Sequence, residues 1–139
     1  MDAVGPRPVL AAAAVRRVVS TVLAGERITR ASISVTFLPT PRMRTLNRKT
    51  FGRDRATDVI AFGLPHDGVI TGDIYVCPAV ARRAARELDV SEREELIRLV
   101  VHGTLHVLGY DHPASARRTS SPMWRRQERY VKRLAGTRQ

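Results

Sequence analysis

The most informative segment of the sequence is residues 91–112, SEREELIRLVVHGTLHVLGYDH. It opens with a capping box, in which the Ser91 hydroxyl accepts a hydrogen bond from the Glu94 amide while the Glu94 carboxylate reaches back to the cap amide. From Leu96 to Leu108 the residues are apolar almost all round. This pattern predicts a helix that is buried in the middle of the fold.

Three of the four histidines fall within this stretch. His102 and His106 are four residues apart, so on a helix they share a face with Cβ atoms about 6 Å apart. A Zn–N bond is only about 2.0–2.1 Å long, so two helical ligands leave the far side of an ion open to a third. Gly109 can end the helix and let the chain fold back, so that His112 becomes the third ligand.

Three neutral imidazoles with an open fourth position are typical of a catalytic zinc site. One histidine on an apolar helix face is more often an ordinary core residue, but the grouping of three favours a metal. Imidazole also suits nickel, copper and iron, so zinc is the default expectation. The fourth histidine, His66, lies in the turn PHDG and is expected to be a surface residue.

A metallopeptidase is the obvious competitor, because HExxH helices carry two histidines at the same spacing. In those helices a glutamate beside the first histidine acts as the general base. Here that position is Gly103. A peptidase would lack its proton acceptor, so we consider this the less favoured alternative.

Length and composition indicate one domain over residues 1–139, large enough to bury a core without disulfides. Cys77 is the single cysteine, which predicts a reducing compartment and a buried strand residue rather than a reactive thiol. No apolar run approaches the roughly 18 residues of a membrane span, and no signal peptide is evident. We therefore expect a cytoplasmic protein.

The charge is strongly positive, with 24 basic against 13 acidic residues and a formal net charge of +11. Of the basic residues, 22 are arginine. Arginine binds phosphate bidentately and stacks on bases, so this excess favours a nucleic acid partner. GC-rich coding could explain arginine in place of lysine, but it does not explain the excess of positive charge.

Hydrophobic periodicity predicts the remaining elements. Alternation or β-rich composition indicates strands, and 3.6-residue spacing with flanking proline or glycine indicates helices. The expected strands are residues 31–38, 57–64 and 69–77, and the expected helices besides the histidine helix are residues 9–23, 41–51, 78–90 and 122–135.

Several of these segments together resemble one known family. They are LN at 46–47, TDVIAF at 57–62, GDI at 72–74, EL at 95–96 and HGTLHVLGYDH at 102–112. The combination is similar to the YbeY family of endoribonucleases, the rRNA maturation factors. It is far more specific than three histidines alone.

The resemblance implies an α+β fold, with a small mixed sheet of about four strands and helices packed around a central buried metal-binding helix. It implies one zinc ion bound by His102, His106 and His112. It further implies single-strand-specific cleavage of RNA in rRNA maturation and ribosome quality control. The expected partners are single-stranded or ribosomal RNA and the ribosome or its proteins.

The chain departs from the family pattern before TDV. Many relatives have a functionally important arginine just before the glycine of that loop, and Phe51 stands in its place. Arg53 is our candidate for supplying a guanidinium to the reaction, with Arg48 and Arg55 as alternatives. The family's usual proline before Thr-Asp is Ala56, and its Ser-Phe-Pro is replaced by AFG at 61–63.

Three aspartates lie in or beside the matching motifs. Asp58 and Asp73 are expected to organise the backbone rather than to act in catalysis. Asp111 is a candidate that could orient His112 or another ligand from outside the coordination sphere, or cap the turn. Both roles of Asp111 remain open.

Two functions from different classes follow. The first is a zinc-dependent endoribonuclease, in which arginines neutralise the charge on the phosphorus and the nucleophile is either water or the neighbouring 2′-hydroxyl. The second is a ribosome-associated RNA-binding factor with a structural zinc.

Overall fold

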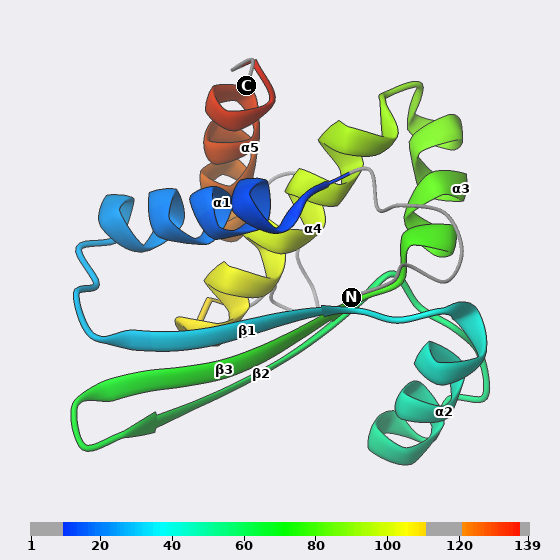
Figure 1. Cartoon of the computed structure of the whole chain (residues 1–139), viewed down its shortest axis with the longest axis horizontal. Helices are drawn as coiled ribbons and strands as arrows, with labels where there is room; N and C mark the ends of the chain where they lie inside the picture. The colour runs from blue at the N-terminus through cyan, green and yellow to red at the C-terminus, as the bar shows by residue number, and fades with distance from the viewer. Residues whose placement is uncertain (1–9, 111–120, 137–139) are drawn as a thin grey trace.

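A computed structural model describes residues 10–110 and 121–136. Over these residues the chain forms five helices and a three-stranded mixed sheet (Figure 1). In chain order these elements are α1 (Ala12–Gly25), β1 (Ala31–Phe37), α2 (Thr40–Phe51), β2 (Val59–His66), β3 (Val69–Val76), α3 (Pro78–Leu88), α4 (Glu92–Val107) and α5 (Pro122–Ala135). The α+β class is confirmed, and the described residues contain three strands rather than about four.

The sheet has the order β1-β3-β2. β2 and β3 form an antiparallel hairpin, which confirms that they are neighbours. Asp67 and Gly68 join them with φ values of 50° and 75°, as the tightest hairpin turns require. β1 runs parallel to β3, with Ala31 opposite Ile70 and Phe37 opposite Val76.

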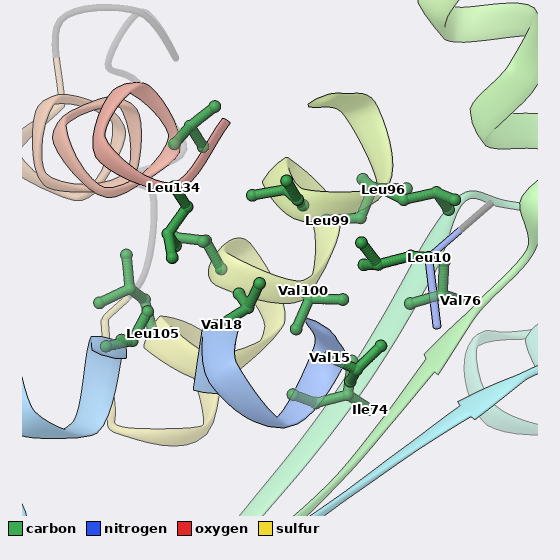
Figure 2. Close-up of a cluster of buried hydrophobic side chains, with 14 of the residues drawn as sticks. Leu10, Val15, Val18, Ile74, Val76, Leu96, Leu99, Val100, Leu105 and Leu134 are labelled. Carbon is green, nitrogen blue, oxygen red and sulfur yellow. The ribbon is translucent and has the colours of Figure 1, made fainter. Parts of the chain in front are cut away.

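The histidine helix α4 is the centre of the molecule, as the sequence predicts. Figure 1 shows α1, α4 and α5 on one side of the sheet. Apolar side chains from these helices and from β3 converge in the main core (Figure 2), where Val100 and Leu105 of α4 are fully buried. The metal-binding candidates therefore lie on a rigid element.

Helix α4 begins where the capping box predicts. Ser91 is the N-cap, and its hydroxyl accepts a 3.0 Å hydrogen bond from the Glu94 amide. The Glu94 carboxylate, expected at the cap amide, instead accepts a hydrogen bond from Arg98. The box is thus confirmed in one half, because an arginine one turn along competes for the carboxylate.

The centre of α4 lies directly on the sheet because small residues allow it. A Cβ atom on Gly103 would lie 2.7 Å from Ile74 Cγ2, and one on Gly72 would lie 2.5 Å from Val107 Cγ1. Each glycine therefore accommodates a branched side chain of the facing element.

Helix α2 packs on the opposite face of the sheet, at one end only. There Met43, Ile60 and Cys77 form a second buried cluster, so the expectation of a buried cysteine is confirmed. Farther along this face Phe62 and Leu64 remain 37% and 67% exposed. Among the described residues, no helix combines the length and the apolar character that crossing a bilayer requires.

Candidate metal centre

His102 and His106 lie on the same face of α4, as their spacing predicts. The centroids of their rings are 5.7 Å apart, and the ring planes are inclined by 79°. His102 is half-buried and His106 is exposed. Two imidazoles at this separation can converge on one ion.

The half-buried histidine has a partner on another helix. Its Nδ1 lies 2.8 Å from Oε1 of Gln127, a residue of α5 that is 2% exposed. The amide oxygen can only accept a hydrogen bond, so this contact requires a proton on Nδ1, and in a neutral imidazole the lone pair is then on Nε2. This is the arrangement in which ligating histidines are commonly held, with one nitrogen donating to a protein oxygen. The donor chemistry of the pair thus fits a zinc ion.

A buried ionic network lies behind Gln127. Arg98, only 13% exposed at its side chain, donates hydrogen bonds to the carboxylates of Glu94, Glu95 and Glu128. The hydrogen bond with Glu128 is the main reason why the pKa of Arg98 is raised. The network joins α4 to α5 next to the histidines.

The pKa values of two carboxylates in this network, Glu95 and Glu128, shift in opposite directions. Burial raises the pKa of Glu95, and this outweighs the opposing hydrogen bond and charge of Arg98. Burial also acts on Glu128, but its hydrogen bonds with Arg98 and Gln127 prevail and its pKa is lowered. The ionised form of Glu128 is therefore favoured, and it accepts a hydrogen bond from Gln127.

The chain changes direction at the end of α4, as the third predicted ligand requires. α4 stops at Val107, and Gly109 has a φ of +106°, so the predicted exit at this glycine is confirmed. Tyr110 then donates a 2.7 Å hydrogen bond from its hydroxyl to Glu26, the residue that ends α1. The chain is thereby fixed at Tyr110, just after α4.

The remaining predicted residues of the site come directly after Tyr110 in the sequence. Asp111 and His112 lie outside the described residues, so the third ligand and the role of Asp111 remain predictions. Within the described ranges, no three histidine, cysteine, aspartate or glutamate side chains gather in a group that could hold a metal ion. The described part of the site is a pair of imidazoles at the exit of α4.

The structure also explains why residue 103 is a glycine and not the glutamate of a metallopeptidase helix. Gly103 is buried against Ile74, so its Cα faces the sheet and not the histidines. A glutamate at this position would need space that β3 already occupies. The geometry therefore argues against a metallopeptidase.

Arg53 lies in a different part of the surface. Together with Arg55 it lines a cavity of about 490 Å³ between the end of α2, the loop that follows and α3, and neither histidine is among the lining residues. Neither arginine forms an ion pair within the described residues. Phe51, at the family's arginine position, is 56% exposed beside the same cavity.

Arg48, the third alternative, is already occupied. It and Arg44 both pair with Asp54, at 3.4 and 2.9 Å. The buried Asn47 donates a 2.8 Å hydrogen bond to the Arg55 carbonyl. The Leu-Asn motif therefore shapes the loop that carries Arg53 and Arg55.

The two upstream aspartates make contacts that fit an organising role. The Asp58 carbonyl accepts a 2.9 Å hydrogen bond from the Cys77 amide, which ties β2 to the start of α3. Asp73 accepts a 2.6 Å hydrogen bond from Ser34 across the β1–β3 pair. Asp73 alternates with Ile74 along β3, so it faces away from α4.

The sequence did not indicate Gln127, Glu128 or Glu26 as parts of the site. Gln127 meets His102 across 25 residues, and Glu26 meets Tyr110 across 84. The Glu94–Arg98 pair was visible as an i,i+4 spacing. The others depend on how α1 and α5 dock on α4, and no local pattern encodes that docking.

Comparisons with known proteins agree with this geometry. The family model described as "Endoribonuclease YbeY" matches residues 9–135. A Thermotoga maritima relative named "Endoribonuclease YbeY" is 36% identical over 104 residues, covering 75% of this chain and 68% of the relative. A Bordetella pertussis relative of the same name is 52% identical over 71 residues, covering 50% of this chain and 45% of the relative.

A solved structure shows the same architecture. The solution structure of a Thermotoga maritima protein superposes with a TM-score of 0.65 at 32% sequence identity. The match covers 88% of this chain and 79% of that one.

Proposed function

Because this chain belongs to the YbeY family of endoribonucleases, we propose that it cleaves single-stranded ribosomal RNA with one zinc ion held by His102, His106 and His112. The family makes the chain an RNA-cleaving enzyme. The zinc, the preference for single strands, and a role in rRNA maturation and ribosome quality control in the cytoplasm are our proposal.

One observation carries the metal part of this proposal. The ring centroids of His102 and His106 are 5.7 Å apart in an edge-to-face arrangement, and His102 Nδ1 donates a hydrogen bond to Gln127. The lone pair of that ring is therefore on the nitrogen that a metal would use. An ordinary core histidine would need neither the second imidazole nor this tautomer.

Within the proposal each group has a physical task. The three histidines hold the ion, which when bound supplies Lewis acidity at a phosphate oxygen or an attacking water. Arg53 and Arg55 line the cavity at the end of α2 and bind further phosphate oxygens of the same RNA strand, away from the ion. The net charge of +11 attracts the polyanion to this surface.

The first test compares variants of the two parts of the site. His106→Ala is expected to lose zinc and cleavage together. Arg53→Ala should keep its zinc and melting temperature but lose at least about tenfold in turnover, or about 1.4 kcal/mol of transition-state stabilisation. Arg17→Ala, which removes the same charge from the exposed face of α1, is the matched control.

The measurements are zinc stoichiometry, melting temperature and cleavage of one RNA as a single strand and as a duplex. A structural zinc would show differently, because His106→Ala would then lower melting temperature and RNA binding in parallel and the wild type would turn over little RNA. The nuclease proposal fails if pure, zinc-loaded protein cuts no RNA, whole ribosomes included.

The ends of the products distinguish the two nucleophiles. A 2′,3′-cyclic phosphate means that the neighbouring 2′-hydroxyl attacks, whereas water leaves a simple monoester. Mass spectrometry of the fragments reads this directly.

A further inference from the structure

A buried glutamine points at a candidate metal ligand. Gln127 is 2% exposed on α5, and its Oε1 lies 2.8 Å from Nδ1 of His102 on α4. Most other buried side chains of α5 are apolar members of the main core, such as Val131 and Leu134. An uncharged amide at such a place is held there by its hydrogen bonds.

The orientation of this amide is fixed from its other end. Gln127 Nε2 donates a 3.0 Å hydrogen bond to Glu128 Oε2. Both carboxylate oxygens of Glu128 also accept from Arg98, at 2.9 and 3.0 Å. An ionised carboxylate is only an acceptor, so the amide nitrogen must face Glu128 and the amide oxygen must face His102.

From this chain of contacts we infer that Gln127 is a positioning residue for His102. It keeps the proton on Nδ1 and holds the ring so that the lone pair on Nε2 meets a divalent cation such as zinc. The inference rests on the proposed function for the identity of the ion. The chain of hydrogen bonds Arg98–Glu128–Gln127–His102 does not depend on that identity.

The alternative is that Gln127 merely satisfies a buried polar contact between α4 and α5. The two readings differ in what they predict for zinc binding. A positioning residue fixes the tautomer of His102 before any ion arrives and thereby raises the affinity for zinc. A packing residue can make the same hydrogen bond, but its removal changes stability without changing the affinity for zinc beyond what the loss of packing explains.

The variant Gln127→Met tests this, because methionine has a similar volume but no acceptor in place of the amide oxygen. We expect its zinc affinity to fall by about 10- to 100-fold, the range usual for removing a partner of a ligating histidine. The double variant Gln127→Glu with Glu128→Gln keeps an acceptor toward His102 and a donor between residues 127 and 128, and it should recover most of that loss. Leu134→Ala, in the core on the same helix, should lower the melting temperature without a comparable loss of zinc affinity.

Two measurements read the outcome. Zinc affinity is measured by competition with a chelator, and the tautomer of His102 by ¹⁵N NMR of the metal-free protein. In the wild type the proton should reside on Nδ1, and in Gln127→Met it should distribute between both nitrogens. The wild-type spectrum tests the inference even if the variant does not fold.

The inference is overturned if wild-type His102 carries its proton on Nε2, or if Gln127→Met binds zinc as tightly as the wild type. It is also overturned if Leu134→Ala weakens zinc binding as much as Gln127→Met does. If the wild type binds no zinc at all, the proposed cofactor fails instead, and the tautomer result stands separately.

Discussion

Gly103 lies between the two histidines in sequence, at a point where α4 packs tightly against Ile74 of the sheet. A Cβ there would meet Ile74 at 2.7, 3.2 and 3.3 Å from three of its carbon atoms. Glycine inside a helix weakens it by roughly 1 kcal/mol relative to alanine. The position therefore trades helix stability for the close approach that sets the depth of His102 and His106.

We predict that Gly103→Ala destabilises the protein despite its better helix propensity. The added methyl group must displace Ile74, and overpacking of this kind costs about 1–3 kcal/mol. Urea denaturation measures the change. Removing the obstacle with Ile74→Ala in the same chain should make the double variant less destabilised than the sum of the single variants. Strict additivity would show that the glycine is not required by Ile74.

At the scale of single residues, the sequence predicts the site as far as local geometry reaches. The i,i+4 spacing of His102 and His106 and the exit at Gly109 follow from helix periodicity and from the absence of a Cβ, and both are confirmed. Gln127 could not be predicted, because its role exists only once α5 is docked.

At the level of elements, a polar cluster joins the ends of α1 and α4 to the interior of α5. Glu26 closes α1 with a side chain that is 7% exposed. It accepts hydrogen bonds from Tyr110 after α4 and from Tyr130 on α5, at 2.7 and 2.5 Å, and pairs with Arg126 at 3.2 Å. This cluster holds the segment that leads toward His112.

The cluster predicts that the protein loses stability at both extremes of pH. Burial of Glu26 opposes its ionisation, but the hydrogen bonds from Tyr130 and Tyr110 and the charge of Arg126 outweigh it, so its pKa is lowered. Its stabilising contribution is complete above the ordinary pKa of 4.5 and is lost as pH falls through the lowered value. Burial and the hydrogen bond to Glu26 raise the pKa of Tyr130 from 10.0 to about 12. Its contribution is complete below pH 10 and is lost as pH rises through about 12.

The variant Tyr130→Phe tests the alkaline limb. It should lower stability at neutral pH by about 1.5–3 kcal/mol, because a hydrogen bond to a charged group is removed. It should also flatten the fall in melting temperature between pH 10 and 12. Tyr75→Phe is the control, because Tyr75 lies away from Glu26 and packs against Phe62 and the cluster of Met43, Ile60 and Cys77. An unchanged alkaline slope in Tyr130→Phe would contradict the prediction.

The positions of the elements themselves could be predicted, because each carries its own periodicity. The alternation of β1 and the proline that opens α3 are local features, and the structure places both elements within a few residues of the expected bounds. The parallel pairing of β1 with β3 could not be predicted. In the sequence α2 and β2 lie between these two strands, and no residue of β1 specifies that it pairs with β3 rather than with β2.

For the molecule as a whole, the excess of positive charge can act in two ways. Single arginines can contact phosphates directly, and the net charge can attract RNA from a distance. Some of the arginines are paired locally, as Arg44 and Arg98 are with their carboxylates. Arg53 and Arg55 line a cavity and form no ion pair within the described residues. Such cations are the ones expected to contact phosphate.

The salt dependence of RNA binding separates these two contributions. For single strands, log K falls with log salt by about 0.7 for each phosphate neutralised. Arg53→Ala and Arg55→Ala should each reduce the slope by about that amount, whereas Arg17→Ala removes the same charge from α1 and should leave the slope nearly unchanged. Binding of a fluorescent single-stranded RNA between low and physiological salt measures all three. If all three variants change the slope equally, the cavity beside α2 does not contact the RNA, and the attraction comes from the net charge of +11 as a whole.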